Sequence, residues 1–418
     1  MMGEWKKYKL KDVCTILGDG LHGTPIYDDK GEFFFINGNN LKDGRISIKN
    51  DTKRVPYSEA NKYKKPLNNR TILVSINGTI GNVAKYRDEK CILGKSACFF
   101  NVKENVDLNF IYYVVANQQF KNTITQLATG TTIKNVSLET MRNYTFCIPP
   151  LSIQKQIGKI LSSLDDKIEL NRRINDNLEQ QAQALFKSWF VDFEPFLSKE
   201  FSKSDSLFGD IPVGWSIVSI KDLPIYITDY VANGSFASLK ENVRLYDKPN
   251  YAHFIRNTDL KAESYKIYVD KHSYEFLAKS VLEGGEIIIS NVGDVGSVFL
   301  CPKLQKPMTL GNNIILLRPK NNYSMFYLYM LFKGNVGQHL IDGITGGSAQ
   351  RKFNKTDFKS IKIMMPPVDI LIKFDRIIKP IFSKIEKNRE EISRLELVRD
   401  TLLPKLMSGE LKINDINN

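Results

Sequence analysis

Cysteine and histidine are scarce in this sequence. Its 418 residues include five cysteines, none in a Cys-x-x-Cys pair, and four histidines, dispersed at positions 22, 253, 272 and 339. A disulfide framework or a zinc site needs such residues at short, regular spacing. The scarcity therefore argues against both, predicts a chain without a metal site, and fits a reducing cytoplasm best.

Long hydrophobic runs are also missing. The longest, such as MFYLYMLF at 325–332, are far too short to cross a bilayer, and the opening MMGEWKKYKL has no apolar stretch of the signal-peptide kind. We therefore expect neither a membrane span nor a secretory leader. With 42% apolar and 25% charged residues, the composition is that of an ordinary folded protein, with room for two or three domains.

Motifs that carry catalysis are absent as well. CILGKS at 91–96 ends like a phosphate-binding loop, but Glu89 stands where that loop needs its first glycine. There is no Asn-Pro-Pro-aromatic motif for amino-group methylation, because the paired prolines stand in IPPL and MPPV. Asp88-Glu89-Lys90 has the composition of part of a nuclease site, but such triplets arise by chance among 59 basic residues. The sequence thus reveals no catalytic site.

Acidic residues are too few to balance the basic ones, and the net charge is +13. Segments 1–150 (22 basic, 14 acidic) and 201–367 (20 basic, 15 acidic) carry +8 and +5, whereas 151–200 and 368–418 come to −1 and +1. A basic surface indicates a polyanionic partner, most often nucleic acid. The alternative is a generally basic proteome.

What the sequence does contain is an internal repeat, a feature that decides the fold where it occurs. KIELNRRINDN at 167–177 returns as KIEKNREEI at 384–392, 217 residues further along the chain. Pro149-Pro150 returns as Pro366-Pro367 at the same offset. The basic blocks repeat too, with offsets of 219, 215 and 216: INGNNLK at 36–42 with IRNTDLK at 255–261, ILVSINGTIGNV at 72–83 with IIISNVGDVGSV at 287–298, and TGTTIKN at 129–135 with TGGSAQRK at 345–352. The chain is therefore two copies of one plan.

Each copy begins with a basic block that we interpret as α+β. ILVSI, NVAKY and ACFFNV are rich in β-formers and bounded by Gly or Asn, whereas DLNFIYYVVANQQF has the length and the Asp start of a helix. We expect the aromatic residues of that helix, such as Tyr112 and its counterpart Tyr327, in the core. Ser137 and Asn354 stand at equivalent places and are predicted to cap short helices.

Each basic block is followed by a charge-balanced segment with the spacing of a long helix. Apolar residues recur every three or four positions from 153 to 189 and again from 374 to 402. Such seams need a partner helix, so we expect the two segments to pair as an antiparallel coiled coil with a pseudo-two-fold axis. Pro380 is predicted to kink the second helix or to mark its start. The predicted segments are 1–150, 151–200, 201–367 and 368–418, in the order block, helical spacer, block, helical spacer.

Asn171 and Asn388 fall on these seams where an apolar residue is expected. A buried Asn fixes the register of a coiled coil, because any slip leaves it unpaired. Each lies at the midpoint of its helix if the helices span 152–190 and 369–407, so the two would meet in an antiparallel pair. The alternative is that both face solvent.

Two stretches carry a family resemblance. LEQQAQALFKSWFVDFEPF at 178–196 and VRDTLLPKLMSGEL at 398–411 closely resemble the ends of the two conserved helices in the DNA specificity subunit of type I restriction–modification enzymes. IPPLSIQKQI, at the start of the first helix, is similar too, whereas the second opens PPVDILIKF without the family's usual Gln. The resemblance covers the whole chain, as recognition domain, helix, recognition domain, helix.

The resemblance implies a subunit without an active site of its own. In that family the subunit binds double-stranded DNA at a bipartite target, one half-site for each target-recognition domain, and recruits two methyltransferase subunits. The full complex adds ATP-driven restriction subunits, and so combines a restriction endonuclease with an adenine methyltransferase that is expected to use S-adenosylmethionine, ATP and Mg2+. Two alternatives stay open: a stand-alone nuclease or methyltransferase with an unrecognised site, and a coiled-coil adaptor that never touches DNA.

Candidate DNA-binding residues come from the repeated loops and from GDGLHGTPIY at 18–27, which resembles the family's first recognition loop. Lys and Arg bind phosphates, and Asn, Gln, Arg, Ser or Thr read base edges. In the first block the candidates are His22, Thr24, Tyr27, Asn37, Asn39, Asn40, Lys42, Lys134, Asn135 and Ser137. In the second block they are Arg256, Asn257, Gln350, Arg351 and Lys352, with Lys240 and Arg244 nearby in the sequence.

Apolar side chains crowd the ends of both predicted helices. They are Trp189, Phe190, Phe193 and Phe196 in the first and Leu402, Leu403, Leu406 and Met407 in the second. Such ends either pack onto the neighbouring recognition domain or form a surface for the methyltransferase subunits.

Overall fold

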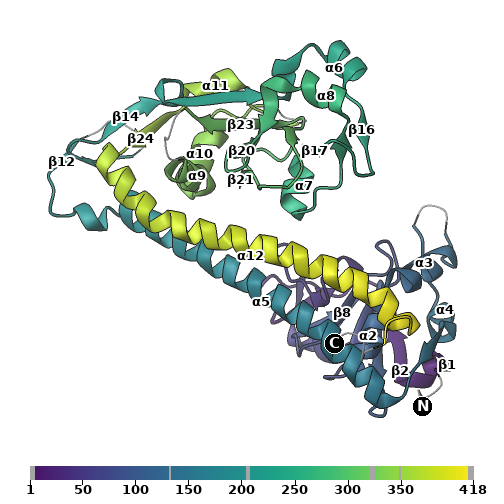
Figure 1. Ribbon diagram of the computed structural model, residues 1–418. Helices are drawn as coiled ribbons and strands as arrows, with labels where there is room; N and C mark the ends of the chain where they lie inside the picture. Colours follow the sequence, from purple (N-terminus) through teal and green to yellow (C-terminus); the bar gives the residue numbers. More distant parts are fainter. Residues whose placement is uncertain (1–4, 131–132, 204–207, 321–324, 348–349, 413–418) are drawn as a thin grey trace. The chain divides into compact units, whose positions relative to one another are not determined.

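The computed structural model describes residues 5–130, 133–203, 208–320, 325–347 and 350–412. The chain forms two compact units, Met1–Asn171 with Glu391–Asn418, and Arg172–Glu390. Each unit combines one α+β block with one half of each of two long helices (Figure 1). The α+β class and the repetition of the block are as predicted.

The first block is built on a four-stranded antiparallel sheet in the order β2-β10-β7-β8. Its strands are β2 (Cys14–Asp19), β7 (Thr71–Ser75), β8 (Val83–Lys85) and β10 (Ala97–Val102). All residues of β7 and β10 are buried, because both faces of the sheet are covered. Ile72 and Val74 pack with Phe110 on one face, and Leu73 and Phe99 with Ile36 on the other.

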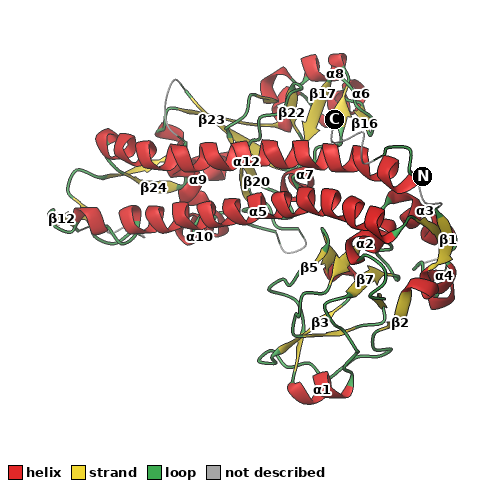
Figure 2. Cartoon of the chain, turned by 60° about the horizontal axis from the view of Figure 1, so that its bottom comes forward, coloured by secondary structure: helices red, strands yellow, loops and turns green. Residues whose placement is uncertain are grey.

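Three helices cover the face of the sheet that carries Ile72 and Val74. A smaller sheet lies on the side of Leu73, where Ile36 packs. The helices are α2 (Leu108–Ala116), α3 (Gln118–Gln126) and α4 (Leu138–Asn143). The smaller sheet has the order β6-β3-β9, and β3 and β9 run parallel. Its strands are β3 (Phe33–Ile36), β6 (Arg54–Val55) and β9 (Cys91–Leu93), with the short pair β4 (Leu41–Lys42) and β5 (Arg45–Ile46) beside them in sequence. α1 (Tyr57–Lys62) lies at the tip of the block (Figure 2).

The second block repeats this plan. Its four-stranded antiparallel sheet has the equivalent order β15-β23-β20-β21, from β15 (Ile225–Asp229), β20 (Ile287–Ser290), β21 (Val298–Leu300) and β23 (Ile314–Pro319). The helices α9 (Phe326–Lys333), α10 (Asn335–Gly343) and α11 (Lys355–Ser360) correspond to α2, α3 and α4. Tyr112 and Tyr327 are 8% and 1% exposed, so both belong to the core as predicted.

The second sheet is larger in this block than in the first. It has five strands in the order β16-β18-β17-β22-β19, and β17 and β22 run parallel, as β3 and β9 do. The strands are β16 (Leu245–Tyr246), β17 (Ala252–Ile255), β18 (Tyr268–Val269), β19 (Val281–Leu282) and β22 (Met308–Leu310), accompanied by α6 (Phe236–Asn242), α7 (Asn257–Ala262) and α8 (Lys271–Phe276). Between β15 and β17 the second block carries α6 and β16, which have no counterpart between β2 and β3 of the first block.

Capping and short strand pairs delimit each block. Ser137 accepts a hydrogen bond from the N–H of Thr140, and Asn354 from that of Asp357, which confirms both predicted N-caps. The start of each block is paired with the strand that precedes a long helix. These pairs are β1 (Lys6–Lys9) with β11 (Thr145–Ile148) and β14 (Ser216–Ser219) with β24 (Lys362–Met365); β12 (Phe201–Ser202) pairs with β13 (Ile211–Pro212).

The two long helices are α5 (Leu151–Phe190) and α12 (Val368–Ser408), and they pack together. In the first unit Asp165 pairs with Arg399 at 2.8 Å, and in the second Glu179 pairs with Arg389 at 3.4 Å. Partner numbers on α12 fall as those on α5 rise, so the helices are antiparallel, as predicted. α12 runs without a break through Pro380, so that residue does not mark the start of the helix. Among the described residues, no helix is long and apolar enough to cross a membrane.

Asn171 and Asn388 are both buried, with 1% exposure each, which excludes the solvent-facing alternative. Nδ2 of Asn171 donates to Oε2 of Glu391 at 2.9 Å, and Nδ2 of Asn388 donates to Oδ1 of Asn175 at 2.8 Å. Each Asn is therefore hydrogen-bonded to the facing helix. A direct pair between the two Asn, and their role in setting the register, stay predictions.

Candidate nucleic-acid interface

Loops at one end of the first block's main sheet are joined by backbone hydrogen bonds. The N–H of Leu21 donates to the carbonyl of Leu93 at 2.7 Å, which brings the 18–27 loop to the 94–96 turn. Ser96 joins two more loops, because its Oγ accepts from the N–H of Gly38 at 2.9 Å and its carbonyl accepts from the N–H of Ile76 at 2.9 Å. The N–H of Val136 donates to the carbonyl of Ile76 at 2.8 Å. Candidate residues 22–24, 37–40 and 134–137 thus come from one connected loop cluster.

The second block assembles the equivalent loops in the same way. The N–H of Gly311 donates to the carbonyl of Ile255 at 2.8 Å, and the N–H of Gly293 donates to the carbonyl of Arg351 at 2.9 Å. The Thr-Gly loop is closed by two bonds between Gly346 and Lys352, as Thr129 and Asn135 close its counterpart. Residues 131–132 and 348–349 of these two loops lie outside the described residues.

Two glycines allow the strands at these clusters to approach closely. A Cβ at Gly94 would lie 2.2 Å from Oδ1 of Asn37, and a Cβ at Gly311 would lie 2.7 Å from the carbonyl oxygen of Ile255. Any larger residue would push the loops apart. Gly94, the glycine of CILGKS, is therefore explained by the close packing of the loops and not by a phosphate-binding loop.

The candidate side chains of the first block differ in their availability. His22, Thr24, Asn39, Lys42 and Lys134 are exposed. His22 lies 2.6 Å from a carboxylate oxygen of Asp19, and Tyr27, 41% exposed, packs against the ring of Phe35.

Three polar candidates of the first block also hold the loops together. Asn40 is 8% exposed, and its side chain binds the N–H of Asn37 and the carbonyl of Ser47. A base contact by Asn40 would first have to break these bonds, so it is part of the framework. Asn135 accepts from the amide of Asn77 at 3.2 Å, and Ser137 caps α4.

In the second block, the candidates of the loop cluster carry more charge. Gln350, Arg351 and Lys352 are exposed, although Arg351 forms an ion pair with Asp342 at 2.5 Å. The guanidinium of Arg256 is bound by Asp259, which raises the pKa of Arg256. The amide of Asn257 donates to Asp294 at 3.1 Å.

Asp294 has an unusually acidic carboxyl group. Burial raises its pKa, but hydrogen bonds from Lys261, Ser297 and Asn257 outweigh burial and lower the pKa to about 2. The carboxylate is therefore charged at neutral pH and ties the 257 loop to the 291–297 turn.

Lys240 and Arg244 lie in a different place. They belong to α6 and the turn after it, and the N–H of Arg244 donates to Oγ of Ser273 in α8 at 3.0 Å. Leu239 of α6 packs with Ala252 and Val269 of the five-stranded sheet. The structure thus places these two exposed side chains beside the five-stranded sheet rather than in the loop cluster.

The apolar end of α5 packs onto the second block, and the apolar end of α12 packs onto the first. Phe190 is 3% exposed and its ring lies 4.9 Å from that of Tyr327 and 5.9 Å from that of Trp215. Phe196 is also buried, and Leu406 is fully buried in the core of the first block. A docking role stays a prediction and would have to use the partly exposed members of the set: Trp189, Phe193, Leu402, Leu403 and Met407.

Sequence reasoning missed the residues that position the candidates. Ser96, Asp259 and Asp294 bind Asn37, Arg256 and Asn257 directly. The signal for Asp259 was present, because the repeat aligns it with Asn40. Within the described part of the chain, no three His, Cys, Asp or Glu residues gather in a way that could hold a metal ion.

Comparison with known proteins agrees with this arrangement. The family model described as "Type I restriction modification DNA specificity domain" matches residues 2–180 and again 212–397. The chain belongs to this family. The two matches cover the two copies of the repeat, and a member of the family is the specificity subunit of a type I restriction–modification system, the subunit that recognises the DNA target rather than a catalytic one.

Similar proteins cover most or all of the chain. The MjaIX specificity subunit of Methanocaldococcus jannaschii is 26% identical over 83% of this chain and 78% of its own length. The HindI specificity subunit of Haemophilus influenzae is 24% identical over 98% of this chain and 100% of its own length. The crystal structure of the type I S subunit from M. genitalium matches 97% of this chain and 96% of its own, with a TM-score of 0.54 and 20% identity. This last likeness concerns the fold.

Proposed function

We propose that this specificity subunit recognises a bipartite DNA target, with one half-site read by each α+β block. The blocks at 1–150 and 201–367 are the target-recognition domains, and the segments 151–200 and 368–418 are the spacers that carry them. The observation behind this proposal is that each block has an equivalent loop cluster on a sheet of equivalent strand order, and that the two clusters carry different side chains. Two similar clusters with different polar groups suit two different short sequences.

The proposal extends to partners and cofactors of the assembled enzyme. Two methyltransferase subunits and the restriction subunits would assemble on this chain, and S-adenosylmethionine, ATP and Mg2+ would be used by those partners in the cytoplasm. The chain itself would supply DNA recognition and a scaffold. The net charges of +8 and +5 on the two blocks support binding to the phosphate backbone.

A co-purification experiment tests the assembly. The chain, expressed with its neighbouring genes, should pull down a methyltransferase, and the isolated chain should bind duplex DNA with an affinity that falls steeply with salt as counterion release is lost. Methyl transfer by the pure chain supplied with S-adenosylmethionine would support the stand-alone enzyme instead.

A mapping experiment tests the division of labour. Methylated bases would be mapped genome-wide for complexes with Gln350→Ala/Lys352→Ala in the second block and Lys134→Ala/Asn135→Ala in the first. Each double variant should alter one half-site and leave the other intact. If either variant alters both half-sites together, the hypothesis that each block recognises one half-site independently is wrong.

A further inference from the structure

Arg256 and Asp259 form a bidentate ion pair in the loop cluster of the second block. Nε of Arg256 lies 2.8 Å from Oδ2 of Asp259, and Nη2 lies 2.7 Å from Oδ1. The Asp259 side chain is 7% exposed, whereas that of Arg256 is 38% exposed. A buried carboxylate thus holds one edge of a guanidinium whose other parts reach solvent.

The guanidinium keeps a second edge that could bind a ligand. Asp259 occupies the edge formed by Nε and Nη2, and the structure gives no partner for Nη1 among the described residues. The edge between Nη1 and Nη2 therefore presents two parallel N–H donors. Because the first edge is fixed by two hydrogen bonds, the direction of the second is also fixed.

The pair lies within the loop cluster. A Cβ at Gly311 would lie 3.2 Å from Cγ of Arg256, so this glycine makes room for the arginine stem. The neighbouring Asn257 binds Asp294, and Gly293 in the same turn as Asp294 binds the carbonyl of Arg351. Arg256 is thereby connected with the exposed loop at Gln350–Lys352.

The corresponding turn of the first block shows that the ion pair is not needed to form the turn. By the repeat, Asn37 and Asn40 stand where Arg256 and Asp259 stand. Oδ1 of Asn40 accepts from the N–H of Asn37 at 3.0 Å, as Oδ2 of Asp259 accepts from the N–H of Arg256 at 3.1 Å. An uncharged amide holds the same backbone, so the charge pair in the second block adds something beyond local structure.

We propose that Arg256 is the guanine-reading side chain of the second recognition domain and that Asp259 is the residue that positions it. O6 and N7 of guanine are the paired acceptors that a guanidinium fork binds in the major groove, and no other base presents two acceptors there in this arrangement. The inference rests on the proposed function, because it assigns one base of the half-site read by this block.

Three variants of the full chain, each co-expressed with its methyltransferase partner, test the inference by methylation mapping. Arg256→Lys keeps the charge but loses the fork, so the preference for guanine at one position of one half-site should fall about 5- to 150-fold, the equivalent of about 1–3 kcal/mol. Asp259→Asn copies Asn40 and should retain the turn while weakening the same guanine preference to a smaller extent. Thr258→Ala, at an exposed position between the two, is the matched control and should leave the target unchanged.

Competition binding with purified chains provides the second readout. Duplexes that carry each of the four bases at the affected position should compete unequally for the unmodified chain, and the advantage of the guanine duplex should be much smaller for the Arg256→Lys chain. An unchanged preference overturns the inference, and so does a uniform loss over all sequences, which marks a phosphate contact. An Asp259→Asn or Arg256→Lys chain that no longer folds overturns it too, because the ion pair would then be structural. Without any sequence-specific methylation by the unmodified complex, it is the proposed function that fails.

Discussion

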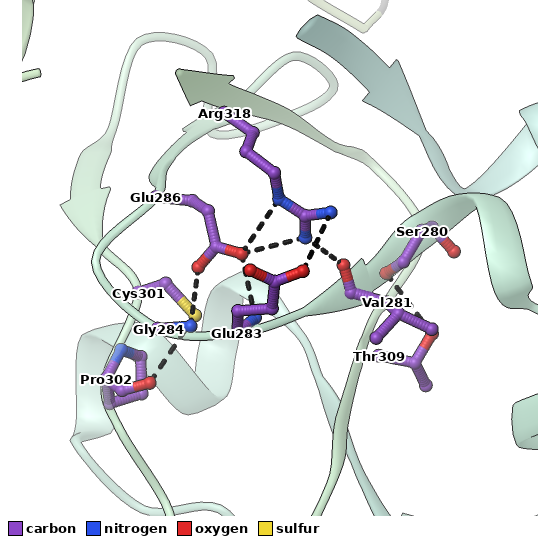
Figure 3. A network of polar contacts seen from close by, with 9 residues as sticks. All are labelled: Ser280, Val281, Glu283, Gly284, Glu286, Cys301, Pro302, Thr309 and Arg318. Carbon is purple, nitrogen blue, oxygen red and sulfur yellow. Dashed lines mark hydrogen bonds and ion pairs between the residues drawn. The ribbon is translucent and has the colours of Figure 1, made fainter. Parts of the chain in front are cut away.

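The two blocks solve the same structural problem with different chemistry. In the first, Oγ1 of Thr71 binds Oδ1 of Asn101 across β7 and β10 at 2.6 Å, and the Asn101 amide donates to the carbonyl of Pro66 at 2.7 Å. In the second, Glu286 and Arg318 hold the equivalent places, and Arg318 donates to the carbonyl of Val281 (Figure 3). We call these two cross-strand contacts the neutral clasp (Thr71–Asn101) and the ionic clasp (Glu286–Arg318).

The clasps show what the repeat preserves. The sheet order and the carbonyl that each clasp holds are equivalent, while the side chains differ in charge and size. Glu286 is only 4% exposed and also accepts from the N–H groups of Glu283 and Gly284, both at 2.7 Å. Paired positions can therefore change together as long as every buried polar atom keeps a partner.

Breaking the ionic clasp should have the largest effect. Arg318→Met leaves the buried Glu286 carboxylate without its cation, and we expect a loss of about 3–5 kcal/mol in the free energy of unfolding of the second block. Hydrogen exchange of β20 and β23, with β7 and β10 in the first block as the internal reference, measures the loss. Equal loosening of both sheets would contradict a local clasp.

Removing the anion that joins the first block to α5 should have the next largest effect. Asp165 accepts from the Tyr113 hydroxyl at 2.5 Å and from Arg399 at 2.8 Å. Asp165→Asn should cost about 1.5–3 kcal/mol, because both bonds involve the charged group. Chemical denaturation measures the loss of stability, and hydrogen exchange of α2 shows whether the loss is local. Asp166→Asn, on the neighbouring residue, is the control. A control with the same loss would point to general charge effects.

The neutral clasp should be less costly to break. Thr71→Val keeps the shape of the side chain and removes one hydroxyl, so we expect a loss of about 1 kcal/mol in the first block. The same hydrogen-exchange experiment compares it with Arg318→Met. A loss as large as that of the ionic variant would show that charge does not distinguish the two clasps.

The smallest effect concerns pH and the loop cluster of the second block. The pKa of Asp294 is lowered from 3.8 to about 2, so its contribution to stability is present above about pH 4 and is lost as the pH falls toward 2. Asp294→Asn should reduce the loss of stability that the second block shows at acidic pH, and should leave the first block unchanged. Hydrogen exchange of the 257–262 helix at pH 5 and pH 3 measures this loss. The same loss in the variant and in the unmodified chain would exclude this role for Asp294.

The sequence predicted the parts of the molecule that depend on local pattern. Recurring motifs revealed two copies, apolar spacing revealed the two long helices, and Ser137 and Asn354 revealed the N-caps of the short helices α4 and α11. Asn171 and Asn388 were identified on the seams because a polar residue breaks the apolar period there. Apart from the repeat, which is found by comparing the two halves of the chain, these features depend on residues a few positions apart, and helix periodicity records them directly.

Only the tertiary structure decided how the candidate residues are used. Asn40 looked as available as Asn39, yet it is buried, and Arg256 looked like a free arginine, yet Asp259 fixes its orientation. The aromatic end of α5 could equally have been a surface, and it is core because β14, α9 and α12 supply its partners. Contacts between residues far apart in the chain determine burial and pairing, and no local period in the sequence encodes them.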